Sequence, residues 1–151
     1  MSQSETRHEI RDLVDRYAIS LDRRDRDGLA ALFTEDVTAD YDGTLVAPGR
    51  AALLDYLGQL ANVADSLHHL GPLTVVDEPD GTVDVVVNAL VVAIPDGTGS
   101  VPALLRSLRY RFTVSGPAGS RRIRSVRHRC LWQSDLLMSA DFSRRSFQDR
   151  P

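Results

Sequence analysis

The stretch Leu13–Asp42, with the sequence LVDRYAISLDRRDRDGLAALFTEDVTADYD, contains a helical pattern followed by the start of a strand pattern. Its first part continues an apolar stripe at three- and four-residue spacing, made of Ile10, Leu13, Val14, Tyr17, Ala18 and Leu21. This spacing predicts one amphipathic helix. Thr6 and Glu9 resemble a capping box that begins this helix. Asp25 is the predicted N-cap of a short second helix that ends at Phe33.

The end of the same stretch alternates apolar and polar residues, which predicts a short edge strand near 36–46. Tyr41 shares a face of this strand with Val37 and Ala39, so we expect its side chain to point inward. A third helix is predicted after Gly49, and its buried positions are Leu53, Leu54, Leu57, Leu60 and Ala61.

From Leu67 onward the sequence is rich in β-branched residues, with turns marked by Gly, Pro and Asp. Four strands are predicted, at about 67–77, 83–94, 104–114 and 121–133. Helices first and a meander of antiparallel strands afterwards is typical of an α+β domain with its helices on one side of a curved sheet. We therefore expect a single domain over 1–151, with its core at about 6–133 and a C-terminal tail at 134–151.

Composition and charge restrict the class of protein. The chain has 151 residues, of which 42% are hydrophobic and 26% charged, as in ordinary globular proteins. All 18 basic residues are Arg, yet they alternate with acidic residues and the net charge is −3, so we expect no nucleic-acid partner. The lone Cys130 excludes an intramolecular disulfide and fits a reducing cytoplasm. No apolar run is long enough for a membrane span, so we expect no membrane partner.

The Leu13–Asp42 stretch resembles the opening of SnoaL-like proteins in the nuclear-transport-factor-2-like superfamily. The resemblance continues through Gly49-Arg50, the segment 68–71 and Trp132. The superfamily includes polyketide cyclases, scytalone dehydratase and ketosteroid isomerase. The resemblance implies a cone-shaped, cystatin-like α+β barrel in which a curved antiparallel sheet and three N-terminal helices enclose a site for a hydrophobic ligand. It also implies a homodimer.

The resemblance suggests four candidate catalytic residues. Tyr17 is similar to a Tyr that stabilises an oxyanion in ketosteroid isomerase, but the positions of that enzyme's base and second acid are occupied by other residue types, so its mechanism is disfavoured. Scytalone dehydratase matches better, because it places an Asp, a Tyr and a His at the positions of Asp22, Tyr41 and His68. Its second His, in the next strand, has no counterpart within 83–94.

His68 and His69 are adjacent on a predicted strand, so only one of them can point into a pocket. The family pattern selects His68, although a bulge at Gly71-Pro72 would reverse the faces. We predict that His68 is a general acid-base and that Asp22 orients it. The alternatives are that Asp22 is a solvated carboxylate, that His68 is a structural residue, and that Tyr17 is a core aromatic.

Further residues are predicted to line the ligand site. Asn88 is the only uncharged polar residue within 83–94, and it either orients a ligand or satisfies a neighbouring polar group. One face of the third long strand and one face of the last supply the other candidates, which are Leu108, Tyr110, Phe112, His128 and Trp132. Trp132 is also a candidate packing anchor. A Cys130–His128 nucleophile pair is the weakest of these hypotheses.

These patterns predict a cofactor-independent enzyme that moves protons on a small hydrophobic, cyclic or polyketide-like metabolite. The reaction would be a dehydration, a cyclisation or an isomerisation. The sequence has no HExxH, GxSxG or phosphate-binding glycine motif, so we expect no metal or nucleotide. Two alternatives remain at this stage: a domain that binds a ligand without chemistry, and an accessory subunit whose cavity is filled by its own side chains.

Overall fold

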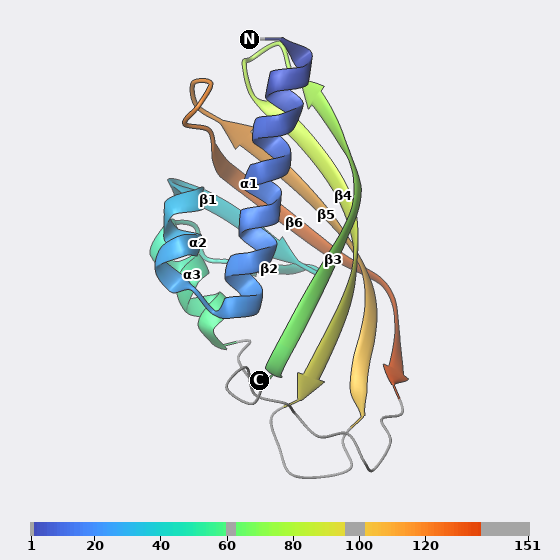
Figure 1. Cartoon of the computed structure of the whole chain (residues 1–151). Helices are drawn as coiled ribbons and strands as arrows, with labels where there is room; N and C mark the ends of the chain where they lie inside the picture. Colours follow the sequence, from blue (N-terminus) through green and yellow to red (C-terminus); the bar gives the residue numbers. More distant parts are fainter. Residues whose placement is uncertain (1, 60–62, 96–101, 137–151) are drawn as a thin grey trace, which may run out of the picture.

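The computed structural model describes residues 2–59, 63–95 and 102–136 (Figure 1). This part of the chain forms three helices, which are α1 (Gln3–Arg23), α2 (Arg26–Leu32) and α3 (Arg50–Gln59). It also forms six strands, which are β1 (Phe33–Tyr41), β2 (Thr44–Val46), β3 (Val63–Asp77), β4 (Val83–Pro95), β5 (Ala103–Ser115) and β6 (Arg122–Leu136). The predicted α+β class and the order of helices and long strands are confirmed.

The six strands form one strongly curved sheet in the order β2-β1-β6-β5-β4-β3. The long strands β3 to β6 are an antiparallel meander, as the turn pattern predicts. The expectation of a wholly antiparallel sheet is wrong, because β1 pairs with β6 in parallel. β1 pairs here with a strand far away in the chain, and local sequence does not encode the direction of such a pairing. Because β2 and β3 are free edges, the cone is open and not a closed barrel.

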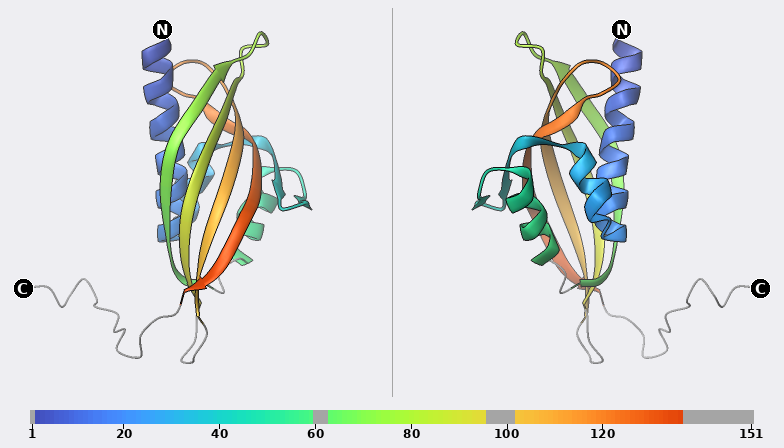
Figure 2. Two further views of the ribbon diagram at one scale, coloured as in Figure 1. Left: turned by 90° about the vertical axis from the view of Figure 1, so that its right-hand side faces the viewer. Right: turned by 90° about the vertical axis from the view of Figure 1, so that its left-hand side faces the viewer.

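All three helices lie on the concave side of the sheet (Figure 2). The predicted stripe of α1 is buried there; it includes Ile10, Leu13, Val14, Tyr17 and Ala18. The ring of Tyr17 packs edge-on against Phe112 of β5, with ring centroids 5.2 Å apart. Apolar side chains fill the interior of the cone around Tyr17 and Phe112, and a cavity remains near the C-terminal end of α1.

The start of α1 differs from the prediction. Ser2 is the N-cap, and it forms a capping box with Glu5 in which each side chain accepts a hydrogen bond from the backbone N–H of the other residue. Thr6 is instead buried within the helix. Glu9 accepts a hydrogen bond from the backbone N–H of Gly119, at 2.9 Å, and so connects the helix to the turn before β6. The predicted N-cap of α2, Asp25, is confirmed.

The predicted short strand near 36–46 is two strands, β1 and β2, and β1 lies inside the sheet between β2 and β6. The parallel pairing places Tyr41 of β1 beside His128 of β6. In α3, Leu53 and Leu54 are buried as predicted, whereas Leu60 and Ala61 lie outside the described residues. The C-terminal tail is described only as far as Leu136.

A bulge in β3 lies at the predicted place but does not reverse the face of His68. Gly71 and Pro72 together oppose the single residue Asn88 of β4. His68 precedes this bulge and pairs with Val91, whose side chain is buried on the concave face. The neighbouring His69 is exposed on the convex face. The choice of His68 over His69 as the inward residue is therefore confirmed.

A second bulge, in β6, turns Trp132 away from the cavity. Cys130 pairs with Leu108 of β5, and Trp132 pairs with Ser107, the residue just before Leu108. Leu131 therefore has no partner of its own. An extra residue in a strand moves the following side chains to the other face. Trp132 is 50% exposed, so its predicted place in the ligand site is wrong.

Candidate active site

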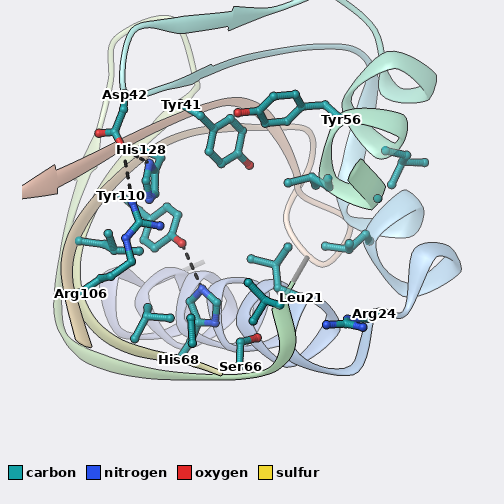
Figure 3. Close-up of a pocket in the computed structure, with 18 of the residues that line it drawn as sticks. Leu21, Arg24, Tyr41, Asp42, Tyr56, Ser66, His68, Arg106, Tyr110 and His128 are labelled. Atoms are coloured by element: carbon teal, nitrogen blue, oxygen red, sulfur yellow. Dashed lines mark hydrogen bonds and ion pairs between the residues drawn. The ribbon is translucent and has the colours of Figure 1, made fainter. Parts of the chain in front are cut away.

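A cavity of about 400 Å³ opens between the end of α1, α3 and the concave face of the sheet (Figure 3). Its size lies within the usual range for small-molecule sites. Its lining is mainly apolar, with leucines from α1, α2, α3 and β5 and small apolar residues from β4. The polar groups that face it include Tyr41, Ser66, His68, Arg106, Tyr110 and His128. A few polar groups in an apolar cavity are typical of a site for a small organic molecule.

Asp22, at the end of α1, contacts His68 of β3 through both of its carboxylate oxygens. Oδ1 lies 2.6 Å from Nδ1 of the imidazole, and Oδ2 accepts a hydrogen bond from the backbone N–H of His68 at 2.9 Å. The hydroxyl of Ser66 donates a further hydrogen bond to Oδ1 at 2.8 Å. The side chains of His68 and Asp22 are only 9% and 17% exposed. The structure thus brings together the two residues that the sequence suggested as a dyad.

The hydrogen bonds to Asp22 determine its charge. Burial is the largest single effect and on its own raises the pKa of the carboxyl group. The hydrogen bonds from the His68 ring and backbone, the charge of His68 and the hydrogen bond from Ser66 together outweigh burial. The net pKa of Asp22 is therefore lowered, and the group is a carboxylate at neutral pH. A carboxylate in this position fixes the orientation of the imidazole.

The other imidazole nitrogen of His68, Nε2, lies on the cavity side, 3.2 Å from the hydroxyl of Tyr110 (Figure 3). When the neutral ring donates its Nδ1 proton to Asp22, Nε2 is an acceptor. Burial raises the pKa of Tyr110 far above its ordinary value, so its hydroxyl stays protonated. Nε2 therefore faces the cavity as a proton acceptor beside a neutral hydroxyl.

Tyr17 and Tyr41 form a second pair, with their hydroxyl oxygens 2.9 Å apart. Tyr41 lines the cavity, as predicted, whereas Tyr17 is buried behind it and is not part of the lining. Burial is the main cause that raises the pKa of both hydroxyls, so both stay neutral. Tyr17 can thus support and polarise Tyr41 but does not itself face a ligand. The expectation that it contacts the ligand is corrected accordingly.

The predicted ligand-binding residues divide into two groups. Leu108, Tyr110 and His128 line the cavity. Phe112 is fully buried in the core behind it, because the strand continues past the end of the cavity. Asn88 is exposed on the convex face, where it accepts a hydrogen bond from Arg109 at 3.0 Å, and its predicted role in the site is wrong.

The parity of β4 explains the placement of Asn88. Its neighbours in the strand, Val87 and Ala89, are buried on the concave face, so the residue between them must point the other way. A polar residue within an apolar run was therefore a sign of the outer face.

The predicted pair of Cys130 and His128 in β6 does not form. The thiol of Cys130 contacts the backbone oxygen of Trp132 at 3.4 Å, and His128 contacts Asp42.

Four charged residues that line the cavity were not predicted, and they are Arg24, Arg26, Arg106 and Asp42. Arg106 enters the cavity from β5, two residues before Leu108 on the same face, so the alternation that identified Leu108 and Tyr110 also indicates it. Asp42 follows β1 in a left-handed conformation, with φ 54°, and its side chain lies at the cavity mouth, whereas simple alternation along β1 would place it on the outer face. This turn at Asp42-Gly43 was the missing signal.

Asp42 lies between His128 and Arg106 (Figure 3). Its Oδ2 is 3.4 Å from Nδ1 of His128 and 3.7 Å from a terminal guanidinium nitrogen of Arg106. Burial is the largest effect on His128 and lowers the pKa of its imidazole; the nearby charges of Arg106, His68 and Arg129 lower it further, and Asp42 opposes them. The His128 ring is therefore neutral at neutral pH.

The structure also bears on metal and membrane binding. Across residues 2–59, 63–95 and 102–136, no three His, Cys, Asp or Glu side chains come close enough together to hold a metal ion. Within the same ranges, no helix combines the length and the apolar character that crossing a bilayer requires.

A conical fold with an apolar cavity and a few converging polar groups defines a class of small-molecule-binding domains. The model of the SnoaL-like domain family matches residues 2–127, and the chain belongs to this family. The sequence has no significant match among curated proteins. The family thus agrees with the resemblance noted from the sequence.

Solved structures with the same fold include enzymes of two kinds. A putative scytalone dehydratase from Novosphingobium aromaticivorans has a TM-score of 0.77 and 22% identity, over 92% of this chain and 95% of that one. A hexachlorocyclohexane dehydrochlorinase of LinA type 2 has a TM-score of 0.81 and 16% identity, over 95% and 98%. The LinA type 3 dehydrochlorinase from Novosphingobium barchaimii has a TM-score of 0.80 and 17% identity, over 96% and 99%. At these identities the likeness establishes the fold alone.

The lowered pKa of His128 gives a testable pH dependence. Between the lowered pKa of the folded state and about 6.5, the unfolded chain binds this proton and the folded chain does not. The free energy of unfolding should therefore decrease as the pH falls through this window. In an NMR titration, Asp42→Asn should lower the pKa of His128 further, because it removes the favourable negative charge.

Arg106→Met should change the pKa of His128 in the opposite direction, since it removes a repelling positive charge. Arg109→Met, on the convex face of the same strand, is the matched control and should leave the titration unchanged. A His128 pKa at or above 6.5, or a rise in Asp42→Asn, contradicts this account.

Proposed function

We propose that the protein is a cofactor-independent acid-base enzyme of the lyase or isomerase type, which acts on a small hydrophobic molecule, cyclic or polyketide-like, held in the cavity. The observation that carries the proposal is the buried Asp22–His68 pair with Nε2 of His68 on the cavity side. A histidine held by a carboxylate can both accept and return a proton near neutral pH. This arrangement suits chemistry in which one group removes a proton and delivers it elsewhere.

In the proposed reaction, Nε2 of His68 removes a proton from a carbon next to a substrate carbonyl. The C–H electron pair moves toward the carbonyl, and the negative charge that develops on its oxygen accepts a hydrogen bond from Tyr41, which Tyr17 supports. Asp22 stabilises the imidazolium that forms. The proton then returns either to a departing hydroxyl group, which leaves as water, or to another carbon. The first outcome is a dehydration and the second an isomerisation.

Elimination is the better supported of these outcomes. The structural neighbours described above include a putative dehydratase and two dehydrochlorinases, and both names denote loss of a small molecule from adjacent carbons. The ketosteroid isomerase pattern is missing here. Tyr41 occupies the position of that enzyme's base, and Leu108 or Tyr110 occupies the position of its second acid. We therefore place dehydration first among the candidate reactions.

The proposal is tested with 5-nitrobenzisoxazole, whose ring opening requires only a positioned base in an apolar cavity. The wild-type protein should accelerate this reaction, and His68→Ala should lower the rate by about 10²–10⁴-fold. Asp22→Asn should lower it by about tenfold or more, because the imidazole loses its orientation and its charge partner. Circular dichroism should show that all variants remain folded.

His69→Ala is the matched control, because His69 is the adjacent residue on the convex face and should not affect the rate. A folded His68→Ala variant with wild-type activity would refute the assignment of His68. If the wild-type protein binds the probe without accelerating its reaction, the alternative is correct, and the domain binds a ligand without chemistry.

We also propose that the protein is a cytoplasmic homodimer that pairs through the convex face of the sheet. The lone Cys130 supports the location. Cross-strand pairing places His69, Leu90, Ser107 and Trp132 in one row over β3 to β6. Leu90 and Trp132 are 45% and 50% exposed, and such apolar side chains gathered on one face favour association.

Sedimentation velocity tests the dimer. The wild-type protein should sediment as a dimer and Leu90→Arg as a folded monomer, since a charge in the middle of an apolar interface is costly. Leu45→Arg, at an exposed position of β2, is the control and should remain dimeric. A monomeric wild-type protein, or a dimeric Leu90→Arg variant, contradicts pairing through this face.

A further inference from the structure

Arg106 is an unusual residue within the apolar cavity. It projects from the concave face of β5, and its side chain is only 29% exposed. Its closest charged neighbour is Asp42, at 3.7 Å, which is too long for a good hydrogen bond. Its Nε atom is buried and has no hydrogen-bond partner among the described residues. Because Arg106 lines the cavity and its contact with Asp42 is long, its terminal nitrogens have hydrogen-bond donors available for a ligand.

Another arginine of the same protein shows what a satisfied guanidinium looks like. Arg129 binds both carboxylate oxygens of Asp40, at 2.8 and 2.6 Å, in the two-pronged geometry that Arg and carboxylate prefer. Arg106 lacks such a partner, although a guanidinium group is a positively charged donor of several hydrogen bonds. A buried charge without a full partner is costly. An anionic ligand would supply the missing partner.

We infer that Arg106 binds an anionic oxygen group of the substrate, such as a carboxylate or an ionised phenol or enol. This inference rests on the proposed function and narrows it, because it defines the substrate as a small apolar molecule that carries an acidic oxygen group. The guanidinium donates paired hydrogen bonds to the anion, and the apolar wall of the cavity holds the rest of the molecule.

The surroundings of Arg106 favour an anion. The charged side chains that line the cavity are Arg24, Arg26, Arg106 and Asp42, so positive groups outnumber negative ones in the described lining. Arg26 is paired with Asp55, at 2.6 Å, which leaves Arg24 and Arg106 as the main sources of positive potential. An excess of positive charge in a concave site raises the local concentration of anionic ligands.

The neighbours of Arg106 also link it to the proposed base. Figure 3 shows Arg106, Asp42 and His128 grouped on one part of the wall, with Tyr110 next to them and His68 beyond it. The ring of Tyr110 lies 5.3 Å from the ring of His128, and its hydroxyl lies 3.2 Å from Nε2 of His68. A molecule anchored at Arg106 therefore lies over Tyr110, with its body directed toward His68. Arg106 thus positions the carbon from which His68 removes a proton.

Asp42 is the competitor for the same guanidinium. Its Oδ1 accepts a hydrogen bond from the backbone N–H of Cys130 at 2.6 Å, which holds the carboxylate at the mouth. Its side chain is 41% exposed, so solvent screens its attraction for Arg106. Substitution by Asn keeps the shape of Asp42 and suits its left-handed backbone, because Asn tolerates positive φ. The variant Asp42→Asn thus removes the competing charge without altering the turn.

The experiment compares two probes of the same shape, 2-naphthoate and the uncharged 2-naphthamide, by isothermal titration calorimetry at neutral pH. The wild-type protein should bind 2-naphthoate about tenfold or more tightly than 2-naphthamide, since hydrogen bonds to charged groups are the stronger ones. Arg106→Met should abolish this preference. Asp42→Asn should increase it. Arg109→Met, on the convex face of the same strand, is the matched control and should leave it unchanged.

The inference is overturned if the wild-type protein binds 2-naphthoate no better than 2-naphthamide, or if folded Arg106→Met keeps the preference. His68→Ala separates this inference from the proposed function, because it should keep the preference for 2-naphthoate while losing the ring opening of 5-nitrobenzisoxazole. If His68→Ala keeps both the preference for 2-naphthoate and the ring-opening activity, the anion site is supported and the assignment of His68 as the base is refuted. If the wild-type protein shows no anion preference and His68→Ala loses activity, the base stands and the anion site does not.

Discussion

The contact between Asp22 and His68 is the interaction on which the arrangement of the site depends. It joins the C-terminal end of α1 to β3, one of the two edge strands of the sheet, and it uses both carboxylate oxygens. The hydrogen bond to the backbone of His68 fixes the strand, and the contact with Nδ1 fixes the ring. One carboxylate therefore sets both the position of β3 relative to the helix and the direction of the proton-accepting nitrogen.

The apolar surroundings determine which groups around this contact are charged and which are neutral. The tyrosine hydroxyls around the cavity stay neutral because burial raises their pKa, so Tyr41 can donate a hydrogen bond to the oxygen that becomes negative in the proposed reaction. The carboxylate of Asp22 stays charged because three hydrogen bonds and the charge of His68 together outweigh the cost of burial. The site thus keeps one fixed negative charge behind the imidazole and neutral donors in front of it. Arg106 adds a positive charge farther along the wall.

The family resemblance and side-chain alternation together predicted most of the site, and local irregularities account for the failures. The resemblance to scytalone dehydratase indicated Asp22, Tyr41 and His68, and alternation in β1 and β5 placed Tyr41 and Tyr110 on the inner face. Trp132 was misplaced because a bulge at Leu131 reverses the faces of β6, and no Gly or Pro marks that bulge. Asp42 was missed because its left-handed turn breaks the alternation of β1. Such features depend on the partner strand, so a single strand pattern does not reveal them.

The fold was predicted as a class and in its order of elements, but not in its long-range pairing. The strands β3 to β6 are consecutive in the chain, so their antiparallel pairing follows from sequence order. The parallel pairing of β1 with β6 joins segments far apart in the chain, and no local signal encodes it. That pairing nevertheless places Tyr41 beside His128 and so closes one wall of the cavity.

The protonation pattern of His68 is the most direct measure of the proposed dyad, and a long-range ¹H–¹⁵N NMR spectrum reports it at a pH where the ring is uncharged. We predict that the proton resides on Nδ1, that its resonance is shifted downfield by the contact with Asp22, and that Asp22→Asn removes this shift. A neutral His68 with its proton on Nε2, or a spectrum unchanged in Asp22→Asn, would contradict the account.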